Sequence, residues 1–368
     1  MKRRYLQSII GILLLCLLLT GQLPCKEEKP EVIVIATGGT IASVKGEMGL
    51  RPAYKPEELI RAVPGLDKYA KLEGKLLLNL DSTNMQPRDW VLIAKEAKKA
   101  QDEGLRGVVI THGTDTMAYT ASMLSFMIKN PKIPIVLTGA QKSIGAKNSD
   151  APGNLTNAVQ FAAYGPPGVY VVFGGKVIRG VRASKMHTGA FDTFQSINAP
   201  YVAEFVDEGN PEAFSKMLPV KKISWPKEKK DSGKTILDTK IDANVLIARL
   251  SPGFKPEWLR KYCNPGQVQG LIILGFGTGN IPNRIPLNLL PVIAEYKKKN
   301  IPVVVMSQCP YGPVEMGVYE VGEKAARLGV IPGGDMTKEA AITKLMWVLG
   351  HTKDPDEVRE LMGKTQDG

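Results

Sequence analysis

Hydroxyl and ionisable side chains gather in two short stretches, ATGGTIAS (36–43) and THGTDT (111–116). A threonine hydroxyl is a weak nucleophile that needs a nearby base or cation before it attacks a carbonyl carbon. Thr114 is followed directly by Asp115, and Lys185 lies in a later strand-and-turn segment. A desolvated lysine can accept a proton, and a carboxylate can orient it and stabilise its charged form. These residues are candidates for a Thr–Lys–Asp relay. The alternative is a surface lysine and an aspartate that caps the helix expected from residue 117.

The glycine pair of TGGT (37–40) has three interpretations: a phosphate cradle, a loop that presents Thr37 or Thr40 as a reactive hydroxyl, or a simple turn. A phosphate loop of the P-loop type requires the spacing G-x-x-x-x-G-K-[ST], which TGGTIAS lacks. The stretch GFGTGN (275–280) ends in asparagine where the dinucleotide fingerprint requires a glycine. The spacing argues against nucleotide binding and leaves the hydroxyl and the turn interpretations open.

Alternating strands and helices must position these residues. Continuous β-branched runs, typical of strands buried on both faces of a parallel sheet, occur at 31–36, 107–111, 133–138 and 168–173. Apolar residues at helical spacing lie between them, at 90–101, 117–130 and 154–164. This order predicts an α/β domain with right-handed crossovers.

A second β/α series follows a lysine-rich stretch without periodicity. Its expected strands are 244–250, 270–275 and 301–306, and its expected helices are 287–299, 319–328 and 336–349. We therefore predict two α/β domains, a larger N-terminal parallel-sheet domain and a smaller C-terminal one. The predicted bounds are 31–206 for the first domain, 207–240 for a linker and 241–368 for the second domain.

Small residues and hydroxyls follow several of the expected strands. In open parallel sheets, ligands bind beyond the carboxyl ends of the strands. The segments at those ends are 37–40, 112–116, 139–142, 276–280 and 307–309. Their shared character favours a common site at one sheet edge over isolated turns.

The first 25 residues have the layout of a secretory signal peptide: a basic start, the apolar run IIGILLLCLLL and a polar exit. The run is short for a membrane span, although an uncleaved anchor is the alternative. Cys25 directly after it raises the possibility of a lipidated N-terminal cysteine, for which Pro24 is an awkward neighbour. We expect export to the periplasm or cell envelope, with possible attachment to the membrane through Cys25.

Composition narrows the function classes. The net charge of +12 falls to +9 without the three basic residues of the leader (12 − 3), and apart from residues 221–230 the charge is scattered, without aromatic interleaving. That pattern indicates a solvated basic surface rather than a nucleic-acid groove. Cys263 and Cys309 are too few for a disulfide framework or a zinc site. Because the three histidines are also dispersed, we predict chemistry without a metal or other cofactor.

These motifs together resemble the bacterial L-asparaginase family, which includes glutaminase-asparaginases. ATGGTIAS and VVITHGTDTMAYTASML (108–124) look like its two signature stretches, and the similarity extends over nearly all of the chain after the leader. LNLDSTNMQPRDW (78–90), GVYVVFGGKVIRGVRASK (168–185) and DMTKEAAITKLMWVLG (335–350) are similar to the type I, usually cytosolic, subgroup. A type I-like body behind an export leader is a mixed case.

The resemblance implies roles for individual residues. Thr40 matches the nucleophile that attacks the side-chain amide of asparagine, and Thr114, Asp115 and Lys185 match the second threonine triad. The oxyanion is then stabilised by Thr114 and by backbone amides near the glycines, which let the substrate approach. The substrate-binding positions implied in the same way are Ser82 and Thr83 for the α-carboxylate and amino group, Asp115 for the amino group, the Ala140 carbonyl for the leaving amide, and Asn280 from a neighbouring subunit. Family members form homotetramers built from tight dimers.

The base for Thr40 is where the sequence departs from the family. The usual tyrosine lies in a loop after the nucleophile, but the best-aligned position here is Leu50. Tyr54 lies four residues further on, and Tyr319 matches a tyrosine that some type I-like relatives use from the C-terminal domain. Packing is an equally good interpretation of both tyrosines.

Three functions fit the sequence to different degrees. The leading hypothesis is an amidohydrolase that converts L-asparagine and water to L-aspartate and ammonia through an acyl-enzyme on Thr40. Alternatives within enzymes are a broader glutaminase-asparaginase or the glutaminase half of a tRNA amidotransferase, against which the expected export and the absence of an extra N-terminal domain argue. A different class is an exported amino-acid-binding protein, which would not need Thr114, Asp115 and Lys185.

Overall fold

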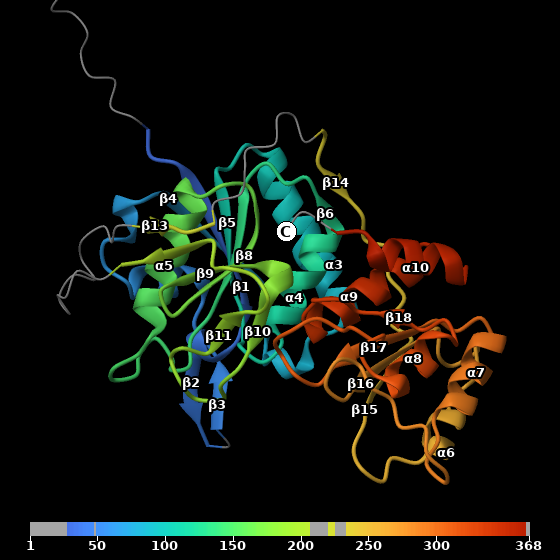
Figure 1. Ribbon diagram of the computed structural model, residues 1–368. Coiled ribbons are helices and arrows are strands. Elements are labelled where there is room, and N and C mark those ends of the chain that lie inside the picture. Colours follow the sequence, from blue (N-terminus) through green and yellow to red (C-terminus); the bar gives the residue numbers. More distant parts are fainter. Residues whose placement is uncertain (1–27, 48, 207–219, 225–232, 366–368) are drawn as a thin grey trace, which may run out of the picture.

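The computed structural model describes residues 28–47, 49–206, 220–224 and 233–365, which form two α/β domains (Figure 1). The larger first domain is built on an eight-stranded sheet with the strand order β13-β12-β9-β8-β7-β5-β1-β4. The smaller second domain is built on a four-stranded sheet with the order β15-β16-β17-β18. The predicted fold class is confirmed. The leader and Cys25 lie outside the described residues.

The first sheet is parallel through its centre and antiparallel at one side. β4, β1, β5, β7 and β8 pair in parallel, whereas β9, β12 and β13 continue the sheet in antiparallel fashion. The strands are β1 (Glu31–Gly38), β4 (Lys71–Leu80), β5 (Gly107–Thr111), β7 (Pro134–Thr138), β8 (Gly168–Phe173), β9 (Lys176–Arg179), β12 (Ala203–Phe205) and β13 (Val220–Lys222). Every residue of β5 and β7 is buried, as continuous apolar runs predict.

Helices cover both faces of this sheet. Val32 and Val34 of β1 pack in the same core cluster as α5, whereas Ile33 and Ile35 pack with α3 and α4 on the opposite face. The alternation follows from the two-residue repeat of a strand, so a strand buried on both sides needs apolar residues at every position. The helices of this domain are α2 (Pro56–Arg61), α3 (Pro87–Asp102), α4 (Met117–Met127) and α5 (Ala151–Tyr164).

The second domain repeats this layout with a fully parallel sheet. Its strands are β15 (Val245–Arg249), β16 (Gly270–Gly275), β17 (Val303–Ser307) and β18 (Ile331–Pro332). Its helices are α6 (Pro256–Arg260), α7 (Leu290–Lys298), α8 (Glu320–Ala326), α9 (Lys338–Leu349) and α10 (Pro355–Gly363). One face of the sheet packs in a cluster with α7, and the other face packs with α9.

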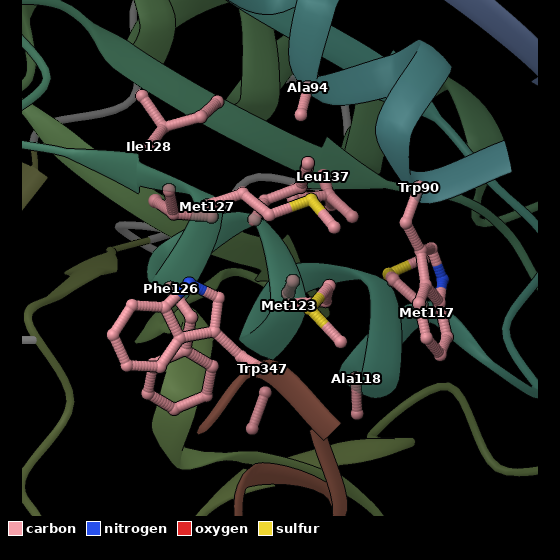
Figure 2. Close-up of a cluster of buried hydrophobic side chains, with 14 of the residues drawn as sticks. Trp90, Ala94, Met117, Ala118, Met123, Phe126, Met127, Ile128, Leu137 and Trp347 are labelled. Atoms are coloured by element: carbon pink, nitrogen blue, oxygen red, sulfur yellow. The ribbon is translucent and has the colours of Figure 1, made fainter. Parts of the chain in front are cut away.

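The two domains share one hydrophobic core. α9 packs against α4 of the first domain, and the Trp347 ring stacks on Phe126 with centroids 6.4 Å apart (Figure 2). The same cluster continues into β16 through Ile272 and into β1 through Ile35. In Figure 1, α4 and α9 accordingly lie between the two sheets.

Small elements depart from the sequence-based expectation. The helix expected over 117–130 ends at Met127, because the next residues form β6 (Ile128–Lys129), which pairs with β14 (Ile236–Leu237). β13 and β14 both fall inside the span predicted as a linker, and both pair with first-domain strands. Two hairpins complete the first domain: β2 (Ser43–Gly46) with β3 (Gly49–Pro52), and β10 (Ala183–Lys185) with β11 (Phe194–Ser196). Among the helices that the structure describes, none is long and apolar enough to cross a bilayer.

Candidate active site

The TGGT segment lies where three backbone segments meet at one sheet edge. Gly38 and Gly39 have φ angles of 106° and 82°, a region that favours glycine. A Cβ atom at Gly38 would lie 2.3 Å from the Leu80 carbonyl oxygen, and one at Gly39 would lie 2.4 Å from the Gly113 nitrogen. The resemblance assigned these glycines to substrate approach. In the structure they first allow the loops after β1, β4 and β5 to touch.

The two threonines of TGGT have different surroundings. The buried Thr37 hydroxyl donates a 2.9 Å hydrogen bond to the Thr111 carbonyl, so it connects β1 to β5. Thr40 begins a short 3₁₀ turn (Thr40–Ala42) and is half-buried. Across the described part of the chain, no hydrogen-bond partner is found for its hydroxyl. Thr37 is therefore occupied in the fold, whereas Thr40 is available for chemistry.

Lys185 meets Thr114 and Asp115 as the relay interpretation requires. Its Nζ lies 2.8 Å from Thr114 Oγ1 and 2.7 Å from Asp115 Oδ1. The Thr114 side chain is buried and that of Lys185 is 18% exposed, whereas Asp115 is 53% exposed. Because an ammonium group only donates, Thr114 Oγ1 accepts this hydrogen bond and its own proton is free for another acceptor. The capping alternative fails for Asp115, since Thr116 is the N-cap residue of α4 and no side chain caps it.

Ser82 and Thr83 lie in a 3₁₀ turn (Ser82–Asn84) after β4, on the other side of the HGTDT loop. A Cβ atom at Gly113 would lie 2.5 Å from Ser82 Oγ, so the buried serine hydroxyl reaches the same junction. The Thr116 hydroxyl donates to the Ser82 carbonyl at 2.7 Å. The Thr83 hydroxyl donates to Asp81 at 2.8 Å. Ser82 is thus fixed beside Gly113.

Ala140 is buried in the turn after β7, and its carbonyl accepts no hydrogen bond from the residues that the structure describes. The turn is held by Asp150, whose carboxylate accepts from the Gln141 and Lys142 amides at 2.9 and 3.0 Å. Asn154 adds a 3.0 Å hydrogen bond to the Gly139 carbonyl. A free carbonyl in a fixed turn fits the implied contact to a leaving amide.

Sequence reasoning missed Asp150 and Asn154, which hold the Ala140 turn. Asp150 lies two residues before Pro152 at the start of α5, a pattern that predicts a helix cap. Its carboxylate makes no cap hydrogen bond and instead binds the amides of the turn. The only available signal was the position of a carboxylate a few residues after a strand end.

Other predicted positions lie elsewhere. Asn280 and Tyr319 belong to the second domain, together with the strand-end segments 276–280 and 307–309, so these segments flank a different sheet from TGGT. Tyr319 is 54% exposed. Tyr54 is half-buried, its amide donates to the Ala42 carbonyl at 2.9 Å, and its hydroxyl lies beside Gly145. Leu50 is exposed on the β2–β3 hairpin.

Family comparisons match both domains. Residues 31–218 match the family model described as Asparaginase, N-terminal, and residues 244–362 match the Glutaminase/Asparaginase C-terminal domain.

The sequence is also similar to individual proteins. The chain is 45% identical over 334 residues to an L-asparaginase of Thermococcus kodakarensis, covering 90% of this chain and 96% of that protein. It is 40% identical over 342 residues to a glutamyl-tRNA(Gln) amidotransferase subunit of Pyrococcus abyssi, covering 90% of this chain and 75% of that protein.

Solved structures agree. The thermostable L-asparaginase from Thermococcus kodakarensis superimposes with a TM-score of 0.82 at 45% identity, covering 91% of this chain and 97% of that one. The L-asparaginase I from Vibrio cholerae superimposes with a TM-score of 0.78 at 30% identity, covering 92% of this chain and 98% of that one.

Proposed function

This chain belongs to the asparaginase family, and we propose from that premise that it hydrolyses L-asparagine to L-aspartate and ammonia. The observation that carries the proposal is the contact of Lys185 with both Thr114 and Asp115, at the sheet edge that also bears Thr40. An amino-acid-binding protein would not need a buried hydroxyl beside an ammonium group. The resemblance to the T. kodakarensis L-asparaginase supports the same reaction.

The proposed reaction has two steps. Thr40 Oγ1 attacks the side-chain amide carbon of asparagine, its proton goes to the leaving nitrogen, and ammonia departs from an acyl-enzyme. A water molecule then attacks the acyl carbon, one of its protons returns to Thr40 Oγ1, and aspartate is released. Each step passes through an oxyanion that needs hydrogen-bond donors.

Thr114 and Lys185 supply one such donor. The Thr114 proton is free to bind the oxyanion because its oxygen already accepts from the Lys185 ammonium. A positive charge behind the hydroxyl strengthens it as a donor. Asp115 stabilises that ammonium and has enough exposed carboxylate surface to bind the substrate amino group.

Ser82 and Thr83 are proposed to bind the α-carboxylate and amino group, and the Ala140 carbonyl the leaving amide. In support, Ser82 lies against Gly113 and the Ala140 carbonyl is unoccupied by the described residues. Asn280 is proposed to complete the site from a neighbouring subunit, in a homotetramer made as a dimer of dimers. The Tyr311, Val318 and Tyr319 side chains of the second domain are each about half exposed and are available for such a contact.

A second candidate is glutamine hydrolysis, which the similarity to the amidotransferase protein of P. abyssi favours. The chain is 45% identical to the T. kodakarensis L-asparaginase and 40% identical to the P. abyssi protein. We therefore place asparagine first and glutamine second.

We also propose export through residues 1–25, with possible lipidation at Cys25, because the leader pattern is that of a signal peptide. The type I-like character of the body gains support from the likeness to the V. cholerae L-asparaginase I. The narrower bacterial assignment stays a prediction. Fractionation of cells that express the full chain, followed by N-terminal analysis of the product, tests export.

Ammonia release from L-asparagine, L-glutamine and D-asparagine tests the activity on the chain without its leader. We expect turnover of L-asparagine at substoichiometric protein. Saturable binding without ammonia would instead support the binding-protein alternative. Faster release from glutamine would reverse the order of the two substrates.

A further inference from the structure

His112, directly after β5, lies at the centre of a buried hydrogen-bond chain. Its side chain has no exposed surface. Nδ1 lies 2.7 Å from the Gly113 carbonyl oxygen, and Nε2 lies 2.9 Å from Thr120 Oγ1. Thr120 also accepts a 3.0 Å hydrogen bond from Trp90 Nε1. The chain thus runs from α3 through α4 to the loop that carries Thr114.

The direction of these hydrogen bonds follows from their end groups. An indole nitrogen only donates, so Thr120 Oγ1 accepts from Trp90 and gives its single proton to Nε2 of His112. A carbonyl oxygen only accepts, so Nδ1 carries the ring proton. Burial lowers the pKa of His112 to about 4, and the ring is neutral at physiological pH. Both ring nitrogens and the threonine hydroxyl have partners.

This series of hydrogen bonds ends at the carbonyl of the peptide between Gly113 and Thr114. A trans peptide directs its C=O and N–H in opposite directions. Since the carbonyl faces His112 in the interior, the Thr114 N–H faces the other way. Within the described residues no acceptor binds that N–H.

Gly113 makes this orientation depend on an external contact. A Cβ atom at this position would lie 2.5 Å from Ser82 Oγ, so a residue larger than glycine would clash with the serine. Glycine torsions are soft, so the peptide could rotate without a group to hold its carbonyl. His112 is the side chain that binds it.

We propose that His112 is a positioning residue, which holds the Gly113 carbonyl so that the Thr114 N–H donates to the oxyanion. This inference rests on the proposed amide hydrolysis. His112 itself neither touches substrate nor exchanges a proton in the reaction.

Two variants of His112 separate positioning from packing. An asparagine amide nitrogen can occupy approximately the place of Nδ1, whereas a glutamine amide reaches the place of Nε2. We expect His112→Asn to retain kcat within about tenfold of the wild type, because the Gly113 contact is kept. We expect His112→Gln to lower kcat by about 100-fold to 1,000-fold, as loss of an oxyanion donor does, with KM nearly unchanged.

Thr120→Val is the matched control. It removes the partner of Nε2 and should lower the Tm, but it leaves the Gly113 contact in place and kcat within about threefold of the wild type. Equal kcat values for His112→Asn and His112→Gln would overturn the proposal. So would a loss in Thr120→Val as large as that in His112→Gln.

Nitrogen NMR of histidine-labelled protein tests the network without catalysis. The chain has three histidines, so His112→Asn assigns the signal by its disappearance. We expect a neutral ring with the proton on Nδ1 from pH 6 to 8. A proton on Nε2, or a doubly protonated ring, would overturn the inference even if the wild type releases no ammonia. Absence of ammonia alone would count against the proposed function.

Discussion

Lys185 lies 2.8 Å from Thr114, although 71 positions separate them and the lysine does not come from the main sheet. Lys185 is the last residue of β10. The residue before it, Ser184, donates a 2.9 Å hydrogen bond to the buried Glu339 of α9. The second domain therefore fixes the strand that delivers the ammonium group. Substitutions in α9 can alter the site without touching it.

Lys185→Met should lower kcat by about 100-fold to 10,000-fold, because the Thr114 hydroxyl loses the charge behind it. Lys176→Met is the matched control: Lys176 also contacts a half-exposed aspartate, Asp192, at 2.7 Å. Both variants should keep their free energy of unfolding within about 1 kcal/mol of the wild type. Steady-state ammonia assays and denaturation measure the two effects. Equal activities in the two variants would contradict the role of Lys185.

Thr40→Ala should abolish ammonia release while the fold remains intact. Thr37→Ala should have the opposite profile, because it removes the buried hydrogen bond to the Thr111 carbonyl. We expect that change to cost about 1 to 3 kcal/mol of stability, with turnover retained by the folded protein. Urea denaturation with parallel ammonia assays distinguishes them. Turnover in Thr40→Ala would exclude it as the nucleophile.

Gly39→Ala should destabilise the protein more than its backbone angle alone explains. Gly39 and Gly104 have similar φ angles of 82° and 85°, but a Cβ at Gly104 meets nothing within 4 Å. Gly104→Ala should cost about 1 to 2 kcal/mol from the left-handed conformation. Gly39→Ala adds a clash with Gly113, worth about 1 to 3 kcal/mol more. The difference between their denaturation midpoints measures the clash together with the cost of the extended conformation of Gly39, whose ψ is 175°.

Tyr54→Phe should lower kcat by about 100-fold if this phenol is the base for Thr40. The Tyr54 amide is hydrogen-bonded to the turn that begins with Thr40, which fixes its backbone relative to the nucleophile. Tyr319→Phe should leave kcat within about threefold, because that side chain is largely exposed in the second domain. The reverse result would assign the base to Tyr319.

Acid should destabilise the native state through His112. Its pKa falls from the ordinary 6.5 to about 4, so between these values the unfolded chain binds the proton and the native state does not. Above pH 6.5 the His112 ring is neutral in both states and does not reduce the free energy of unfolding. As the pH falls from 6.5 toward 4, protonation of the ring in the unfolded chain lowers the free energy of unfolding by about 3 kcal/mol. Denaturation at pH 7 and 4.5 should show this loss in the wild type. His112→Asn should not show the part of this stability loss that comes from protonation of the His112 ring.

The central strands were predictable because their burial on both faces demands unbroken apolar runs. The expected 107–111 and 168–173 coincide with β5 and β8. The convergence of 37–40, 112–116 and 139–142 follows from the parallel order of those strands. β4 was not predicted because it is an edge strand in which no residue is fully buried, so it lacks the continuous apolar run of the central strands.

The supports of the site were not predictable in the same way. The Asp150 and His112 contacts depend on which loop a side chain faces, and composition does not encode that. The sequence places His112 at a strand end but does not reveal its partners, which are a carbonyl and a hydroxyl. Lys185 reaches Thr114 from the β10–β11 hairpin. Strands of three residues are too short to show a hydrophobic pattern in the sequence, so this hairpin was not predictable.

The stacked Phe126 and Trp347 rings join the two domains, so neither domain is expected to fold well when it is expressed without the other. Because α4 and α9 bury each other, a truncated first domain would expose an apolar flank next to the HGTDT loop and aggregate. The two family segments should melt in one transition and resist being swapped as modules between relatives, unless both helices are exchanged together. Recombination across residues 219–243 would therefore separate two sequence segments that fold as one unit.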